Sequence, residues 1–221
     1  MLRDVWNIVQ KDFLIERHSR QMLTAMMVFS LLVVLIFNFA LEFDARARLE
    51  ASAGIIWATF AFAGTLGLNR SLSLETENNS MDGLLTAPIE RSAIFFGKFI
   101  GNLLFMLIVE AVTLPIYSIL YNINMLVPAL MGVIVLGSIG YAAVGTLLSS
   151  MAVQTRTRDL LLPVLLFPIV IPVLVAAVKA SSGILNGSAS DFILPSINLI
   201  VVFDLVMVAL GYMFFDYIVE E

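Results

Sequence analysis

Hydrophobic residues in this chain gather into six long runs that are separated by short polar segments. A helix that crosses a membrane needs about 20 consecutive, mostly apolar residues. The runs reach or approach that length, so the pattern predicts an all-α membrane protein with six transmembrane helices. The expected spans are residues 22–41, 51–68, 92–121, 125–153, 160–178 and 193–218.

The N-terminal segment, residues 1–21, has a different pattern. Its apolar residues recur at helical spacing, and its charged residues lie elsewhere on the helical wheel; the apolar positions are Leu2, Val5, Trp6, Val9 and Phe13. This spacing predicts an amphipathic helix that lies in the membrane interface, with Trp6 at the depth of the lipid headgroups. The alternative is a helix in water that packs on a partner protein.

The distribution of Lys and Arg predicts the orientation, because cytoplasmic loops carry the excess of these residues. With six spans and both termini in the cytoplasm, nine of the 12 basic residues fall on the cytoplasmic side and three on the outer side. The three outer residues are Arg46, Arg48 and Lys179. We therefore expect a multi-pass membrane protein with both termini in the cytoplasm.

Composition supports this prediction and narrows the function. The 221 residues are 60% hydrophobic and 13% charged, whereas soluble domains average about 45–50% and 25%. We expect a lipid bilayer around a single permease domain, residues 22–221, because no polar stretch is long enough to fold alone. With no cysteine, disulfides and thiolate metal sites are excluded, and nothing in the sequence suggests nucleic acid.

The sequence also lacks the residues for the enzymes that this topology could host. A nucleotide-binding loop needs Gly-x4-Gly-Lys-Ser/Thr, but the Gly-Lys pair at Gly97 is followed by Phe99. Intramembrane proteolysis would need a base near Ser138, and the one histidine, His18, lies outside the spans. We expect no catalytic residue, no metal and no bound cofactor, with ATP bound by a partner. His18 is expected to be a loop residue near the headgroups, and a haem or metal ligand is the alternative.

Two acidic residues, Glu110 and Asp204, fall within the expected spans. Ionisable groups at that depth are costly and usually face the bundle interior or a wet cavity. One interpretation is a polar pathway or a contact that couples helices. The other is a protonated carboxyl bonded to a neighbouring side chain, for which Asn102 and Thr113 on the helix of Glu110 are candidates.

Proline and glycine mark two further features. Pro163, Pro168 and Pro172 lie in the fifth span, where each removes a backbone donor, so we expect a broken or strongly kinked helix that acts as a hinge. The alternative is that membrane helices simply tolerate proline. Gly97 and Gly101 form a Gly-x3-Gly motif that lets two helices approach closely. A Ser/Gly/Asn-rich loop is expected at 180–190.

The longest polar stretch between spans is residues 69–91. Within it, apolar residues alternate with acidic ones, which predicts a short cytoplasmic helix that docks into a groove on a soluble subunit. A solvated loop is the alternative. The candidate coupling residues are Leu72, Glu75, Glu77, Met81, Asp82, Gly83, Leu84 and Leu85.

Several of these segments together resemble the CcmB family, the haem exporter protein B of cytochrome c maturation. The resemblance rests on residues 53–57 (Ala-Gly-Ile-Ile-Trp), 17–19 (Arg-His-Ser) and 168–174 (Pro-Ile-Val-Ile-Pro-Val-Leu). Residues 81–88 (Met-Asp-Gly-Leu-Leu-Thr-Ala-Pro), followed by Gly-Lys, are shared more widely with ABC-2-type permeases. The resemblance spans nearly the whole chain.

The resemblance implies a membrane permease subunit of an ABC-type complex for cytochrome c biogenesis. Such subunits pair with a cytoplasmic ATPase (CcmA) and assemble with a haem-handling membrane protein (CcmC) and a small membrane protein (CcmD). The complex delivers haem, its cargo, to the periplasmic chaperone CcmE. Either haem passes through this subunit, or ATP hydrolysis releases the haem-loaded chaperone. The spans contain no plausible set of haem ligands, which favours the second scheme.

Other functions stay open at this point. One is the permease of another ABC-2-type exporter, for a drug, a lipid or a polysaccharide. Another is a scaffold or a secondary transporter, although a secondary transporter should show paired broken helices in inverted repeats. Six spans are half of the usual twelve, so either two copies associate or this chain faces a different membrane partner.

Overall fold

The computed structural model describes residues 1–41, 45–77, 89–152 and 158–220, with side chains described for 1–41, 46–74, 89–151 and 161–215. Within these ranges the chain forms helices and no strand. The helices are α1 (Leu2–Ser19), α2 (Gln21–Ala40), α3 (Ala45–Glu77), α5 (Arg91–Tyr121), α6 (Pro128–Ala152), α7 (Arg158–Leu185) and α8 (Ser190–Glu220).

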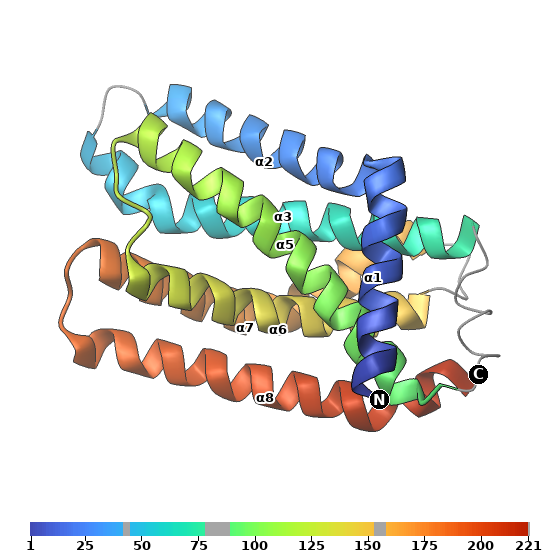
Figure 1. The fold of residues 1–221 in the computed structure, drawn as a ribbon. Helices are drawn as coiled ribbons and strands as arrows, with labels where there is room; N and C mark the ends of the chain where they lie inside the picture. Colours follow the sequence, from blue (N-terminus) through green and yellow to red (C-terminus); the bar gives the residue numbers. More distant parts are fainter. Residues whose placement is uncertain (42–44, 78–88, 153–157, 221) are drawn as a thin grey trace.

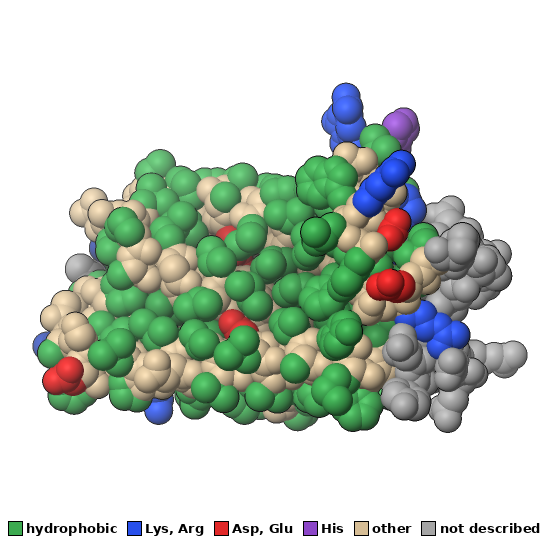
Figure 2. All heavy atoms as spheres, turned by 60° about the horizontal axis from the view of Figure 1, so that its bottom comes forward, with side chains coloured by type: hydrophobic (Ala, Val, Ile, Leu, Met, Phe, Trp, Pro, Cys, Tyr) green, Lys and Arg blue, Asp and Glu red, His purple; other side chains and the backbone are tan. Residues whose placement is uncertain are grey.

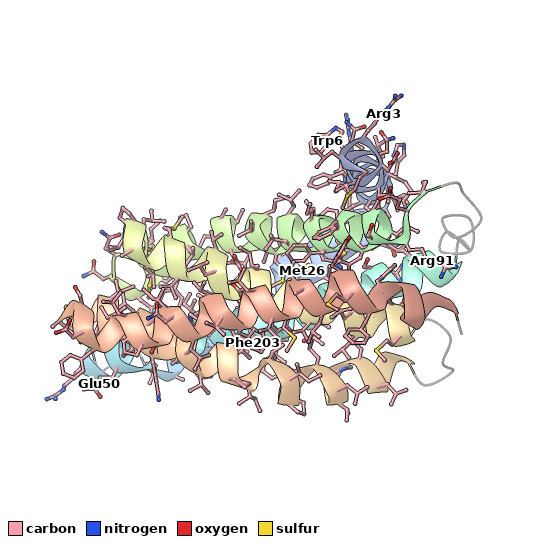
Figure 3. All side chains as sticks on the ribbon, turned by 90° about the horizontal axis from the view of Figure 1, so that it is seen from below. Arg3, Trp6, Met26, Glu50, Arg91 and Phe203 are labelled. Atoms are coloured by element: carbon pink, nitrogen blue, oxygen red, sulfur yellow. The ribbon has the colours of Figure 1, made fainter. Side chains whose placement is uncertain are left out.

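Six of the described helices, α2, α3, α5, α6, α7 and α8, are long and apolar enough to cross a membrane. The predicted fold class is therefore confirmed. These helices run side by side along one axis, and α1 lies across them near one end (Figure 1). Both ends of the chain lie at that same end of the bundle, which we call the terminal end. Arg91 marks the terminal end and Glu50 the opposite end (Figure 3).

Burial separates the inner helices from the outer ones. In the most apolar stretch of each span, α3 and α6 are mostly buried, whereas α2 and α8 bury a small part of their residues. The exposed surface along the bundle is largely hydrophobic (Figure 2). In water such a surface would drive aggregation, so lipid or another membrane protein must cover it.

Two spans extend beyond their expected limits. Helix α3 covers Ala45–Glu77 where 51–68 was expected, so the first part of the polar segment 69–91 continues the second span. Helix α7 continues to Leu185, so the expected loop at 180–190 is wrong for its first half. The extension is stabilised by packing, because Ala180 and Ser181 are buried and Ser181 accepts a hydrogen bond from Trp57.

Helix α7 is not broken at its prolines, and the expected kink and hinge there stay a prediction. The helix runs without interruption over Arg158–Leu185 and contains all three prolines. Pro168 and Pro172 are exposed and Pro163 is half-buried, whereas the interior face of the helix carries Leu166 and Val170. Proline inside a membrane helix is tolerated where local adjustment satisfies the freed carbonyls, and packing of the apolar face holds α7 together.

Candidate functional site

The amphipathic helix α1 packs against the start of α5. Its buried face carries Val5, Ile8 and Val9. The close approach is made at Gly97, where an added Cβ would lie 2.7 Å from the Cβ of Ile8. The Gly-x3-Gly motif therefore receives α1 instead of another span, and any side chain at Gly97 would push the two helices apart.

An ion pair fixes this contact. The ammonium of Lys98 donates hydrogen bonds to both carboxylate oxygens of Asp12, at 3.2 and 3.1 Å. The Lys98 side chain is 5% exposed and that of Asp12 is 15% exposed, so the charges meet mostly out of water. The ammonium of Lys11 lies 2.9 Å from Asp12 as well. Removing Lys98 would leave the largely buried Asp12 carboxylate with only the more exposed Lys11 beside it, which is destabilising.

The same end of α1 also holds the start of α2. Glu16 is buried, and its carboxylate accepts hydrogen bonds from the backbone N–H groups of Met22 at 3.3 Å and Leu23 at 2.8 Å. The first N–H groups of a helix have no acceptor within the helix itself, and a negative charge near them is favourable. Arg20 forms the corner between α1 and α2 with a left-handed backbone, φ 53°.

The C-terminal part of α3, which extends beyond the expected span, lies next to these contacts. Ser71 and Leu74 of α3 line a small cavity of about 30 Å³ with Lys11, Asp12 and Lys98. Helices α2 and α5 each contact both α1 and α3, and they contact each other, so a displacement of the end of α3 would be passed to α5 directly and to α1 through α2 and α5. We call this meeting point the four-helix junction.

The structure describes only some of the expected coupling residues. Three belong to α3: Leu72, Glu75 and Glu77. Leu72 is 2% exposed, so its side chain packs inside the bundle and not on a docking face, which corrects that part of the expectation. The other five lie outside the described residues: Met81, Asp82, Gly83, Leu84 and Leu85.

The two intramembrane acids lie in the interior, on either side of α6. Glu110 on α5 is 2% exposed and accepts a hydrogen bond of 2.6 Å from the Ser138 hydroxyl. Its partner is thus on a neighbouring helix. The candidates on its own helix are engaged elsewhere, since Asn102 donates to Thr146 at 3.0 Å and Thr113 bonds to Ser30 at 3.1 Å.

Asp204 on α8 is 6% exposed and packs against Gly140, two residues beyond Ser138. A Cβ at Gly140 would collide with the Asp204 carboxylate, so this glycine provides the space for it. Among the described residues, neither oxygen of Asp204 meets a donor in hydrogen-bond geometry. A charged carboxylate is costly at this depth, so both acids are compatible with the protonated state.

Trp57 is a site residue that sequence reasoning did not interpret. Its indole N–H donates to the Ser181 hydroxyl at 2.9 Å, and its ring fills the space left by Gly137. The sequence could have indicated a polar contact at Trp57, because a buried tryptophan needs a partner for its N–H. It could not have identified Ser181 as that partner, because Ser181 lies 124 positions away on α7.

The described part of the chain offers few candidate ligands for a metal or a haem. It contains no group of three or more His, Cys, Asp or Glu side chains that could hold a metal. His18 belongs to the last turn of α1 and not to the expected loop, and its exposed ring has Nδ1 3.1 Å from the carbonyl oxygen of Leu14. Any ligand role for His18 would therefore be at the surface of the junction and not inside the bundle.

Comparison with known proteins decides the family. The sequence model of the family described as "CcmB protein" matches residues 3–217, which covers α1, the junction and all six spans. This chain belongs to the CcmB family. The match agrees with the resemblance carried by the Ala-Gly-Ile-Ile-Trp segment around Trp57.

Individual relatives are distant but cover most of both chains. "Heme exporter protein B" of Rhodobacter capsulatus is 26% identical over 152 residues, 67% of this chain and 69% of the relative. The protein of the same name from Pseudomonas aeruginosa is 23% identical over 166 residues, 75% of this chain and 74% of the relative. That from Bradyrhizobium diazoefficiens is 26% identical over 164 residues, 74% of each. CcmB membership therefore rests on the length of the match.

Proposed function

We propose that this CcmB-family chain is the membrane permease subunit of an ABC-type complex for cytochrome c biogenesis in a bacterial inner membrane. It does not hydrolyse ATP. Instead, it receives force from a CcmA-like ATPase and uses it in haem delivery. The observation that carries the proposal is the four-helix junction, which belongs to a chain matched by the CcmB family over residues 3–217.

The orientation follows from charge. Arg91 and Arg3 lie at the terminal end (Figure 3), and Lys98 contacts Asp12 of α1 there. Arg46 and Arg48 lie on α3 close before Glu50, which marks the opposite end, and Lys179 is near the C-terminal end of α7. By the positive-inside rule the terminal end faces the cytoplasm. That is the side on which an ATPase is available, and α3 ends and α5 begins there (Figure 1).

The geometry favours coupling through the junction. An ATPase that pushes on residues 75–85 would move the end of α3. Lys98 and Asp12 tie α1 to α5, and Glu16 ties α1 to α2, so the four helices would tilt together as a rigid body. Helix α7 would bend at Pro163, Pro168 and Pro172, where the backbone lacks a donor.

Haem is the proposed cargo of the complex, because the relatives are named heme exporter protein B. The further partners would be a CcmC-like haem-handling protein, a CcmD-like small membrane protein and a CcmE-like periplasmic chaperone. With no metal-ligand group among the described residues, we favour release of the haem-loaded chaperone over passage of haem through this subunit.

Co-purification tests the proposal. The tagged chain is extracted in mild detergent with its native partners, and the co-purified proteins are identified by mass spectrometry. We expect a P-loop ATPase and a haem-handling membrane protein. Asp82→Arg should remove the ATPase. The control is Asp191→Arg, which reverses the charge of an exposed residue in the first turn of α8, at the end of the bundle opposite the terminal end. This variant should retain the ATPase.

Three outcomes would contradict the proposal in different ways. A complex without any ATPase would remove the coupling role and leave only the six-span fold. An ATPase without a haem-handling protein would point to another ABC-2-type exporter. An ATPase that stays bound after Asp82→Arg and after Leu84→Arg would place the contact outside segment 75–85.

A further inference from the structure

A groove opens in the corner between α1 and α2, beside the start of α5. Its volume is about 780 Å³, and it is lined by Gln10, Phe13, Leu14, Glu16, Arg17, Arg20, Leu23, Thr24 and Phe105. Helix α1 stands out from the bundle here (Figure 3), and basic side chains gather on this projection (Figure 2). The groove adjoins the small cavity of the junction, with which it shares Glu16 and Phe105, but Arg17 and Arg20 have no part in the coupling proposed above.

One part of the groove is apolar and open to the surroundings. Phe13 of α1 stacks on Phe105 of α5, with ring centroids 4.7 Å apart. Leu14 is exposed and Leu23 is half-buried. These residues form a continuous hydrophobic lining between a helix that crosses the bundle and the outer span α2, so its depth matches that of lipid acyl chains next to the headgroups.

The other part of the groove is cationic. Arg17 and Arg20 are both exposed, and neither has an ion pair with another described residue. The one carboxylate in the lining, Glu16, is already engaged by the backbone N–H groups of Met22 and Leu23. Two guanidinium groups are therefore free to bind an anion at the rim of an apolar groove.

The backbone of Arg20 forms the corner at which the groove opens. Its φ of 53° lies in the left-handed region, which residues other than Gly, Asn and Asp rarely adopt because the Cβ crowds the following carbonyl. Arg20 is the C-cap of α1, and its backbone N–H donates to the carbonyl oxygen of Glu16, as at many helix ends. Glycine would adopt this conformation with less strain.

We propose that this groove binds an anionic phospholipid of the cytoplasmic leaflet. Arg17 and Arg20 hold the phosphate by charge-assisted hydrogen bonds, and an acyl chain lies along Phe13, Leu14, Leu23 and Phe105. The exposed Trp6, 58% exposed on the same helix, sets α1 at headgroup depth. The lipid thereby fills the angle between α1 and α2. This inference rests on the six-span topology and on the orientation, and it does not depend on the ATPase partner.

A thermal-shift experiment tests the inference on the full chain. The protein is delipidated in detergent and given phosphatidylglycerol, phosphatidylcholine of the same acyl chains, or inorganic phosphate. We expect phosphatidylglycerol to raise the melting temperature by several degrees more than phosphatidylcholine does, and phosphate alone to have no effect. Arg17→Gln/Arg20→Gln should abolish most of that difference. The control Arg3→Gln/Lys179→Gln loses the same charge outside the groove and should keep it.

Arg20→Gly separates ligand binding from folding. It removes the strain of the positive φ and also removes a guanidinium, so the delipidated variant should melt no lower than the parent and yet respond less to phosphatidylglycerol. Native mass spectrometry should show correspondingly less retained lipid. The inference would be overturned if both lipids raised the melting temperature equally, or if phosphatidylglycerol raised that of the double variant as much as that of the parent. Displacement of the retained lipid by hemin, as a tighter ligand, would overturn it as well.

Discussion

Lys98 on α5 and Asp12 on α1, 86 positions apart in the chain, form an ion pair with an N–O distance of 3.1 Å. The pair joins an amphipathic helix to a membrane span at the place where Gly97 lets them touch. It therefore turns α1 from a surface attachment into a structural part of the bundle. Its removal is the most direct test of the four-helix junction.

We predict that Lys98→Met loosens α1 and lowers stability by about 1.5–3 kcal/mol, because the largely buried Asp12 then keeps only the more exposed Lys11 as a partner. Asp12→Asn/Lys98→Met should recover part of the loss, since neither variant side chain is charged. Stability is measured by denaturation in mixed detergent micelles. Lys179→Met, at an exposed position of α7, is the matched control and should change little.

Detachment of α1 can also be observed directly, because the chain has no cysteine. Ile8→Cys places a single thiol on the buried face of α1. We expect slow reaction with a water-soluble maleimide in the parent background and much faster reaction when Lys98→Met is added. Equal rates in both backgrounds would show that the ion pair does not hold α1 in place.

Gly140→Ala should separate α6 from α8, because the added methyl group would occupy the position of the Asp204 carboxylate. We expect a loss of about 1–3 kcal/mol, typical of overpacking. Adding Asp204→Ala should restore stability by removing the obstructing group. Gly132→Ala on the same helix meets no atom within 4 Å and should be neutral or stabilising by up to about 1 kcal/mol.

Ser138→Ala should destabilise the bundle by about 1 kcal/mol, because it leaves the buried Glu110 without its hydrogen-bond donor. Glu110→Gln keeps the size and an acceptor and should stay close to the parent in stability. The control Ser150→Ala removes a hydrogen bond within α6 itself and should change little. A parent-like Ser138→Ala variant would mean that the Glu110 contact contributes no stability.

Trp57→Phe should lower stability and shorten the ordered part of α7, since the indole N–H holds Ser181 in the extension of that helix. A cycle with Ser181→Ala measures the coupling, which we expect at about 0.6–1.5 kcal/mol for a hydrogen bond in a membrane protein. Trp6→Phe, at an exposed position of α1, is the control. A coupling of zero would leave the extension to apolar packing alone.

The success of the sequence analysis followed the strength of each signal. Apolar run length located all six spans, and the spacing of Val5 and Val9 identified the buried side of α1. The limits of α3 and α7 were missed because polar residues such as Ser181 were read as loop residues. In the bundle they are helical, since another helix supplies their hydrogen-bond partners.

The candidate site shows the same division. From residue type and spacing, Gly97 and Gly101 were recognised as a packing motif, and Glu110 and Asp204 as unusual for a membrane span. Their neighbours were not, because those neighbours come from other helices. Gly97 faces Ile8, and Glu110 accepts from Ser138 instead of a residue on its own helix.

By itself the sequence determined that this protein crosses a membrane six times, that its basic residues favour one side, and that its N-terminal helix has two faces. These properties depend on local composition and periodicity, which act within one helix length. Only the tertiary structure decided that α1 packs on α5 through Asp12 and Lys98, that α7 stays continuous through its prolines, and that Gly140 makes room for Asp204. Those outcomes depend on which helices meet, and contacts between distant segments are formed only when the whole bundle packs.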